Sequence, residues 1–194
     1  DRYDYDTLVA KPDMPITKID TDPSIDRREA YRLGRENVNQ YAERFDRNGT
    51  PMMYIEDLGK YVVVGRRALE HGLDRRASSQ SGVVAHLGDI LHNSIVINEA
   101  DPKKDGVRNS WIMLGIAEDS DGNLVYVRSV VNQSTMEVDE VSSLYAVLGK
   151  KNKAGRVVAP DGRTNGSGIP SNLTISVADL LGNVNGLFDD VISE

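Results

Sequence analysis

The sequence contains no cysteine, and this absence excludes several kinds of chemistry. Without thiols the chain can form neither a disulfide nor a thiolate nucleophile. A structural zinc cluster, which ordinarily relies on cysteine ligands, is not expected either. A cysteine-free chain is consistent with a reducing compartment.

Long apolar runs are also missing. No stretch approaches the roughly 18 consecutive apolar residues of a membrane-spanning helix, so we expect no membrane segment. No signal-peptide pattern opens the chain. The chain begins with Asp1 rather than Met, and we interpret it as a piece of a longer polypeptide.

The formal net charge of −7 argues against broad, non-specific binding to nucleic acid. Local charge differs from the total in two segments. Residues 60–76 hold five basic and two acidic side chains, and residues 149–156 hold four basic and no acidic ones. Each of these segments either binds the phosphate backbone of a nucleic acid or forms a solvent-exposed surface.

The length of 194 residues suits one domain with an additional arm. Residues 1–24 are rich in Asp and Pro, which predicts an extended arm or linker. Residues 25–194 are expected to form a single domain, in which the Gly-rich residues 151–172 form a mobile loop.

Periodicity predicts helices first and then strands. Helical patterns cover residues 24–47 (with Ser24 as the N-cap), 66–71, 83–91 and 176–188. Strand-like patterns cover residues 52–58, 60–65, 93–99, 110–119, 124–132 and 142–148. The expected fold class is therefore α+β, with N-terminal helices packed on an antiparallel sheet of about four strands and a C-terminal helix.

His71 is the first candidate for chemistry. It ends the short predicted helix within "VVVGRRALEHGLDRR" (residues 62–76), directly before Gly72. An imidazole can act as a general acid or base near neutral pH; the alternative is a surface histidine that caps the helix end. The spacing of His86 and His92 is not that of a helical zinc site, so we expect both to be structural or solvent-facing.

The segment "LVYVRSVVN" predicts a strand with two different faces. Alternation places Val125, Val127, Ser129 and Val131 toward the core, and Leu124, Tyr126, Arg128, Val130 and Asn132 on the other face. Because a guanidinium binds phosphate oxygens bidentately, Arg128 indicates a phosphate-binding cleft. The alternative is a polar side facing a sheet edge.

Metal-free cleavage of RNA needs a base, an acid, and donors that hold the phosphorane. The expected catalytic group is His71, Arg128, Tyr145 and Lys150. No acidic cluster typical of a two-metal nuclease, no P-loop and no dinucleotide or nucleophile-elbow motif occurs. The hypothesis therefore invokes no metal and no cofactor.

Several segments resemble a known group of phage proteins. They are "DRYDYDTLVAKPDMPIT", "VVVGRRALEHGLDRR", "LGDILHNSIVINEADP", "YVRSVVN", "LYAVLGKK" and "ISVADLLGNVNGLFDDVI". Together they resemble a domain near the end of phage and mobile-element polyproteins that accompanies MuF-type minor head proteins. This domain is similar to nucleases of the barnase–EndoU–colicin–RelE-like superfamily.

The resemblance implies N-terminal helices on a four-stranded antiparallel sheet, with metal-independent RNA cleavage at the sheet face. The matching positions are His71 in "HGL", Arg128 and Asn132 in "VR..VN", and Tyr145 and Lys150 in "LYA…K".

The sequence is compatible with three functions. The first is a phage-borne endoribonuclease or toxin, with Arg75, Arg76, Asn132 and Ser143 as substrate-binding residues. Its expected partners are RNA (tRNA among the candidates), an immunity or inhibitor protein, and the parent phage polyprotein, in the host cytoplasm or the virion. The second is a non-catalytic binding module associated with the phage head or polyprotein. The third is an ADP-ribosyltransferase-like effector, for which no convincing Glu-x-Glu pair is found.

Overall fold

The computed structural model describes residues 2–22, 24–73, 80–100, 106–134, 139–148 and 174–184; for Gln80, Ser134 and residues 139–148 it describes the backbone. The helices are α1 (Tyr5–Val9), α2 (Arg27–Gln40), α3 (Arg66–Leu73), α4 (Gln80–Ala85), α5 (Leu87–His92) and α6 (Val177–Val184). The strands are β1 (Met14–Pro15), β2 (Thr17–Lys18), β3 (Ala42–Phe45), β4 (Pro51–Ile55), β5 (Lys60–Val63), β6 (Ile95–Ala100), β7 (Val107–Glu118), β8 (Leu124–Ser134), β9 (Asp139–Leu148) and β10 (Thr174–Ile175).

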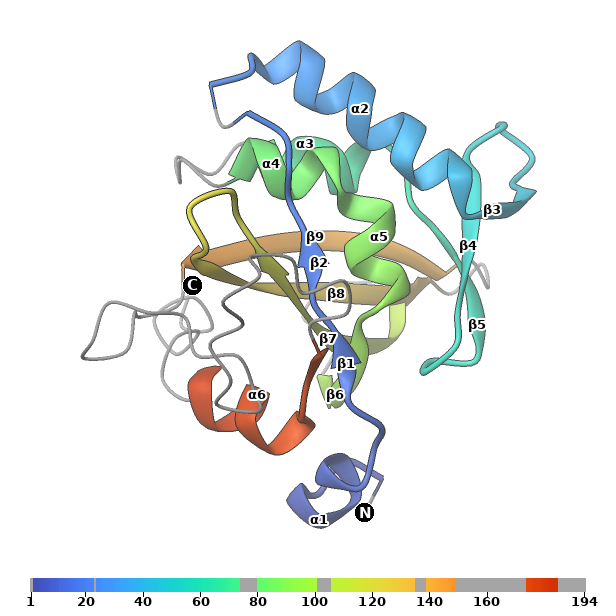
Figure 1. Cartoon of the computed structure of the whole chain (residues 1–194). Coiled ribbons are helices and arrows are strands. Elements are labelled where there is room, and N and C mark those ends of the chain that lie inside the picture. Colours follow the sequence, from blue (N-terminus) through green and yellow to red (C-terminus); the bar gives the residue numbers. More distant parts are fainter. Residues whose placement is uncertain are drawn as a thin grey trace.

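The strands form one large sheet and one small one (Figure 1). The antiparallel meander of about four strands is confirmed as β6–β7–β8–β9. The sheet is larger than expected, because β2 joins β7 and β5 joins β9 through short parallel pairings, giving eight strands. β1 and β10 form a separate two-stranded sheet. The predicted α+β class, including the C-terminal helix, is confirmed.

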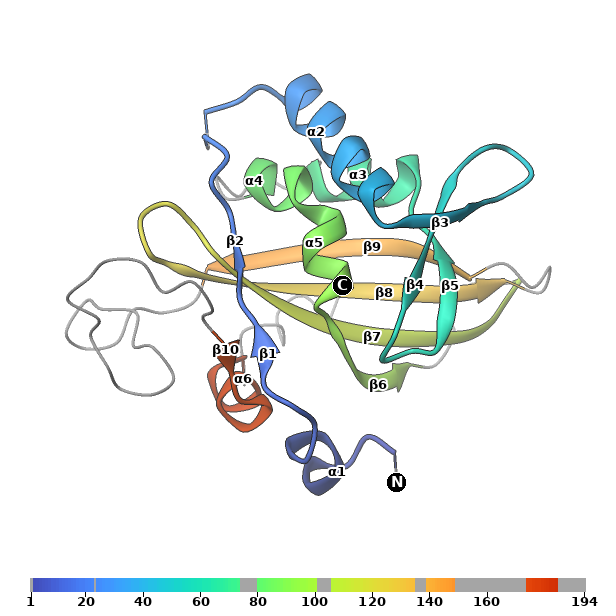
Figure 2. The same ribbon diagram turned by 45° about the vertical axis from the view of Figure 1, so that its right-hand side comes forward.

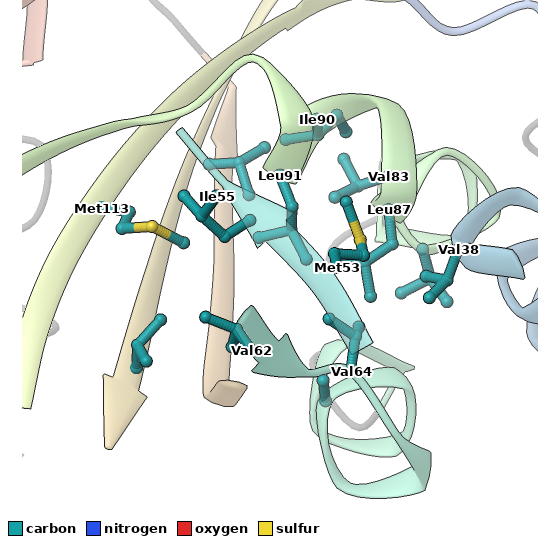
Figure 3. Packing of buried hydrophobic residues seen from close by; sticks show 14 of the residues in the cluster. Val38, Met53, Ile55, Val62, Val64, Val83, Leu87, Ile90, Leu91 and Met113 are labelled. Atoms are coloured by element: carbon teal, nitrogen blue, oxygen red, sulfur yellow. The ribbon is translucent and has the colours of Figure 1, made fainter. Parts of the chain in front are cut away.

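Helices α2 to α5 cover one face of the large sheet (Figure 2). Val125, Val127 and Val131 of β8 are buried beneath this layer, as their alternation predicts. Figure 3 shows the apolar side chains that fill the space between the helices and the strands. The labelled side chains are Val38, Met53, Ile55, Val62, Val64, Val83, Leu87, Ile90, Leu91 and Met113.

The opposite face of the sheet carries a second core, beneath α1, α6 and the small sheet (Figure 1). Tyr126 and Leu114 reach it from β8 and β7, and Leu180 reaches it from α6. Since neighbouring residues of a strand point to opposite faces, the same two strands contribute to both cores.

The first long helix is shorter than its sequence pattern predicts. α2 ends at Gln40, and its N-cap is Asp26 rather than Ser24: the Asp26 carboxylate accepts the backbone N–H of Glu29 at 2.8 Å. The following residues form β3, which pairs with β4, and Phe45 is 62% exposed. Hairpin hydrogen bonding therefore overrides the helical periodicity after α2.

Residues 1–24 were expected to form an extended arm or linker, but the described part of this segment is packed against the rest of the chain. It contains α1, β1 and β2, and it buries Leu8, Met14 and Ile19 in the two cores. The ammonium of Lys11 also lies 2.5 Å from the carboxylate of Asp57, in the turn between β4 and β5. This segment is thus part of the packed structure.

The last described helix begins as the sequence predicts. The backbone N–H of Asp179 donates to the Ser176 hydroxyl at 3.2 Å, which is the expected cap. The predicted loop at 151–172 and the second half of the closing helix, with Leu187 and Phe188, lie outside the described residues.

In the ranges that the structure describes, no helix is both long and apolar enough to cross a membrane. The longest, α2, has 14 residues. It extends about 21 Å, against roughly 30 Å for the hydrocarbon core of a bilayer.

Candidate functional site

Helix α3 presents its polar side chains on one face. Ala68, Leu69 and Gly72 are buried toward the sheet. The outer face carries Arg66, Arg67, Glu70 and His71, whose spacing places them on adjacent turns of the helix. The amphipathic pattern of "RRALEHGL" therefore anchors the helix and exposes its basic residues.

These four side chains line an open hollow of about 440 Å³. Arg66 Nε donates to Glu70 Oε1 at 2.7 Å, and this hydrogen bond raises the pKa of Arg66 above its usual value. The hollow thus combines two guanidinium groups, one carboxylate and one imidazole. Such a set can attract a phosphate and exchange protons with a bound substrate.

A second group of predicted residues meets on β8 and β9. Arg128 and Asn132 are half-buried on the face of β8 opposite to the core valines. The backbone register pairs Arg128 with Tyr145 and Val130 with Ser143. The Asn132 side-chain oxygen also accepts a hydrogen bond from the Ser110 hydroxyl at 2.6 Å. Neighbouring strands therefore bring these backbone positions together.

The structure does not bring His71 and Arg128 together. Helix α3 packs on the face that buries Val127, because Ala68 and Leu69 belong to that core. Arg128 follows Val127 directly and therefore belongs to the other face of the sheet. The single catalytic group expected from the sequence is thus divided between the two faces.

Arg75, Arg76 and Lys150 lie outside the described residues. For Tyr145 and Ser143 the structure gives the backbone position.

Glu70 lies at this candidate site, although the sequence predictions do not include it. Its position four residues after Arg66 was the available signal, because side chains at this spacing meet on a helix surface. The sequence indicates Arg66 and Arg67 as part of a basic segment but does not predict that they line a hollow.

His86 belongs to a polar cluster instead of facing solvent. Of the two roles expected for it, structural or solvent-facing, the structural one fits its contacts. Its Nε2 lies 2.9 Å from the Thr21 hydroxyl and 3.0 Å from a carboxylate oxygen of Asp20. Its Nδ1 lies 3.3 Å from Asp89 Oδ2. His86 therefore connects the segment before α2 to helix α5.

Asp89 is the centre of that cluster. Tyr41 donates its hydroxyl to Oδ1 at 2.5 Å, and the Asn37 amide donates to Oδ2 at 2.9 Å. The hydrogen bond with His86, reinforced by those from Tyr41 and Asn37, lowers the Asp89 pKa to about 2. Burial, with the hydrogen bond to Asp89, raises the pKa of Tyr41 to about 12.

No group of three or more histidine, aspartate or glutamate side chains within the described ranges is placed to hold a metal ion. Comparison of the chain with protein families, curated proteins and solved structures finds no match.

Proposed function

We propose that this chain is an endoribonuclease domain that cleaves RNA at the α3 hollow without a metal ion. The observation that carries the proposal is the grouping of His71, Glu70 and two arginines around one open hollow. A nucleotide unit of a chain can enter such an open hollow.

The proposed reaction is an internal transesterification. The Glu70 carboxylate accepts the proton of the ribose 2′-OH, and O2′ forms a bond to phosphorus. The P–O5′ bond breaks as His71, in its protonated form, donates a proton to O5′. The products are a 2′,3′-cyclic phosphate and a 5′-hydroxyl. Glu70 is left protonated and His71 neutral, and proton exchange with water restores both.

The arginines serve the phosphate. Arg66 and Arg67 are exposed at the start of α3, and a guanidinium can stabilise the negative charge on the equatorial oxygens. Arg66 also holds Glu70 in place through their hydrogen bond. Arg128 lies on the other face of the sheet and is not assigned to this reaction.

The proposed partners are RNA, with tRNA among the candidates, an immunity or inhibitor protein, and a parent phage polyprotein. The proposed setting is the host cytoplasm or the virion. The resemblance of "VVVGRRALEHGLDRR" and "YVRSVVN" to phage nuclease domains supports this assignment.

The test is incubation of the purified chain with total RNA in EDTA. We expect cleavage that leaves 2′,3′-cyclic phosphate ends. His71→Ala should lower the rate by about 10²- to 10⁴-fold, the usual contribution of a general acid. Arg67→Ala should lower it by roughly 10- to 100-fold, through a lost charged hydrogen bond.

Arg35→Ala is the matched control, because Arg35 is an exposed arginine on α2 that does not line the hollow. It should leave the rate unchanged. Cleavage that EDTA abolishes, or that His71→Ala retains in full, would refute the proposal.

A second candidate function is the non-catalytic binding module. The separation of His71 from Arg128 and the net charge of −7 favour it. It predicts that folded protein leaves RNA intact and co-purifies with phage heads. His71→Ala and Arg128→Ala would not change that association.

A further inference from the structure

A second hollow lies where α2 ends, beside β4 and the end of α5. Its volume is about 220 Å³. Its lining residues are Gln40, Tyr41, Ala42, Glu43, Tyr54, Glu56 and His92. Three of these seven side chains are aromatic and two are carboxylates, and the α3 hollow shares none of them.

Aromatic rings at this hollow are held by neighbouring groups. The rings of Tyr41 and His92 are stacked, with centroids 4.8 Å apart and planes 29° apart. The Tyr41 hydroxyl is fixed by its hydrogen bond to Asp89. The Tyr54 ring packs against Tyr61, with centroids 5.1 Å apart. These contacts restrict the rings before any ligand arrives, which lowers the cost of binding.

Apart from the imidazole of His92, the ionisable side chains that line the hollow are acidic. Glu43 and Glu56 contribute two carboxylates, while the lining within the described part of the chain includes no lysine or arginine. Glu43 is positioned by the Tyr61 hydroxyl, which donates to its Oε2 at 3.1 Å. Carboxylates beside aromatic faces favour a cation over an anion or a neutral group.

The strands beside this hollow already contain a contact between a cation and an aromatic ring. The guanidinium of Arg44 lies over the Tyr61 ring, 4.0 Å from its centroid. Tyr61 is the ring that packs against Tyr54. An aromatic ring of the β3–β5 region therefore holds a guanidinium within the chain itself.

We infer that this hollow binds an organic cation, namely a guanidinium or ammonium group on an alkyl stem. The volume is below the roughly 300 Å³ at which sites for drug-sized ligands begin, so it fits one cationic head group and part of its stem. The inference does not depend on RNA cleavage.

The test is an NMR titration of the whole chain with n-butylguanidinium, followed through the aromatic resonances of Tyr54 and His92. n-Butylurea, which has the same shape without the charge, is the ligand control. We expect saturable shifts with the cation alone, weakened when salt shortens the Debye length below about 10 Å.

The variants assign the binding to the hollow. Glu43→Gln with Glu56→Gln should weaken binding by about 10-fold, because both positions lose their charge while the amide oxygen introduced at position 43 can still accept from Tyr61. Tyr54→Leu should weaken it by about 2- to 5-fold, the range of one exposed cation–π contact. Glu36→Gln is the matched control, since Glu36 is an exposed carboxylate on α2 outside the hollow, and it should bind as wild type does.

Equal shifts with n-butylurea, no saturable shift, or full binding by the double variant would overturn the inference. A parallel titration with the capped tripeptide Gly-Arg-Gly distinguishes two possible origins of the bound guanidinium group, a protein side chain and a free small molecule. Tighter binding of the peptide identifies an arginine side chain of a partner protein. Tighter binding of n-butylguanidinium identifies a free small cation.

Discussion

At the scale of single residues, the Asp89 side chain connects three others. Its two oxygens contact Tyr41, Asn37 and His86, which come from the C-terminal end of α2, from α2 itself and from the start of α5. Asn37 also accepts the Asp89 backbone N–H at 2.8 Å. A carboxylate with this many donors is stabilised in its ionised form.

The first prediction concerns acid stability. The Asp89 pKa is lowered from 3.8 to about 2 in the folded protein. The contribution of Asp89 to the free energy of unfolding is therefore fully present above the pKa of the unfolded chain. It is lost as pH falls from about 4 through about 2. This difference in pKa corresponds to about 2 kcal/mol of the free energy of unfolding. Urea unfolding of wild type should show this loss, and Asp89→Asn should be less stable at neutral pH with a flatter acid dependence.

Asp22→Asn is the control for that experiment. Asp22 also has a lowered pKa, from hydrogen bonds with Ser24, but it is fully exposed. Solvent screening should therefore leave the acid dependence close to that of wild type. An Asp89→Asn profile that overlays the wild-type profile would contradict the assignment.

At the scale of elements, a glycine sets how closely the helices approach one another. A Cβ placed on Gly34 of α2 would lie 2.5 Å from the Val84 carbonyl oxygen of α4, and 2.8 Å from Leu69 Cδ2 of α3. The first contact is with backbone, which cannot move away without shifting a helix. The packing of α2 on α3 and α4 thus requires a residue without a side chain.

The second prediction uses two helical glycines as a matched pair. Gly34→Ala should lower the free energy of unfolding by about 1–3 kcal/mol, the usual cost of overpacking. Gly182→Ala in α6 should leave it unchanged or raise it by up to about 1 kcal/mol, because no described atom lies within 4 Å of the added Cβ. Chemical denaturation measures both, and a stabilising Gly34→Ala would show that α2 can move away.

At the scale of the whole molecule, one sheet separates two cores. Met113 and Leu114 are neighbours in β7, yet the first belongs to the core under α2–α5 and the second to the core under α6. The N-terminal segment contributes to both cores through Ile19, Leu8 and Met14. Shared strands should couple the two cores in unfolding.

The third prediction tests that coupling. Leu91→Ala in the first core and Leu180→Ala in the second both remove fully buried side chains, so each should cost about 2–5 kcal/mol. Trp111, the single tryptophan, lies in the first core. Its fluorescence should report a single unfolding transition, and either variant should shift the midpoint of that transition to a lower urea concentration. A Trp111 transition that Leu180→Ala leaves unmoved would show that the cores unfold separately.

Much of the local structure could be predicted because its causes lie within a few residues. Alternation in β8 predicts that Val125, Val127 and Val131 lie in the core, and Ser176 caps the last described helix. Helix α3 follows from the spacing of Ala68 and Leu69 among charged residues. These features depend on backbone geometry and on which side chains avoid water.

The candidate sites were less accessible to such reasoning. Local patterns selected His71 and Arg128 individually but carry no information about which face of the sheet each one reaches. The cluster around Asp89 joins residues 52 positions apart in the chain, from Asn37 to Asp89. The aromatic hollow likewise needs the end of α2, β4 and the end of α5 to meet.

The amino-acid sequence alone therefore determined the α+β class, the antiparallel meander and the polar outer face of α3, because each arises from short-range periodicity. Only the tertiary structure decided that residues 42–45 leave the helix for a hairpin, and that the N-terminal segment packs into both cores. It also decided that His71 and Arg128 lie on opposite faces. These outcomes depend on contacts between distant segments, which no short window of sequence contains.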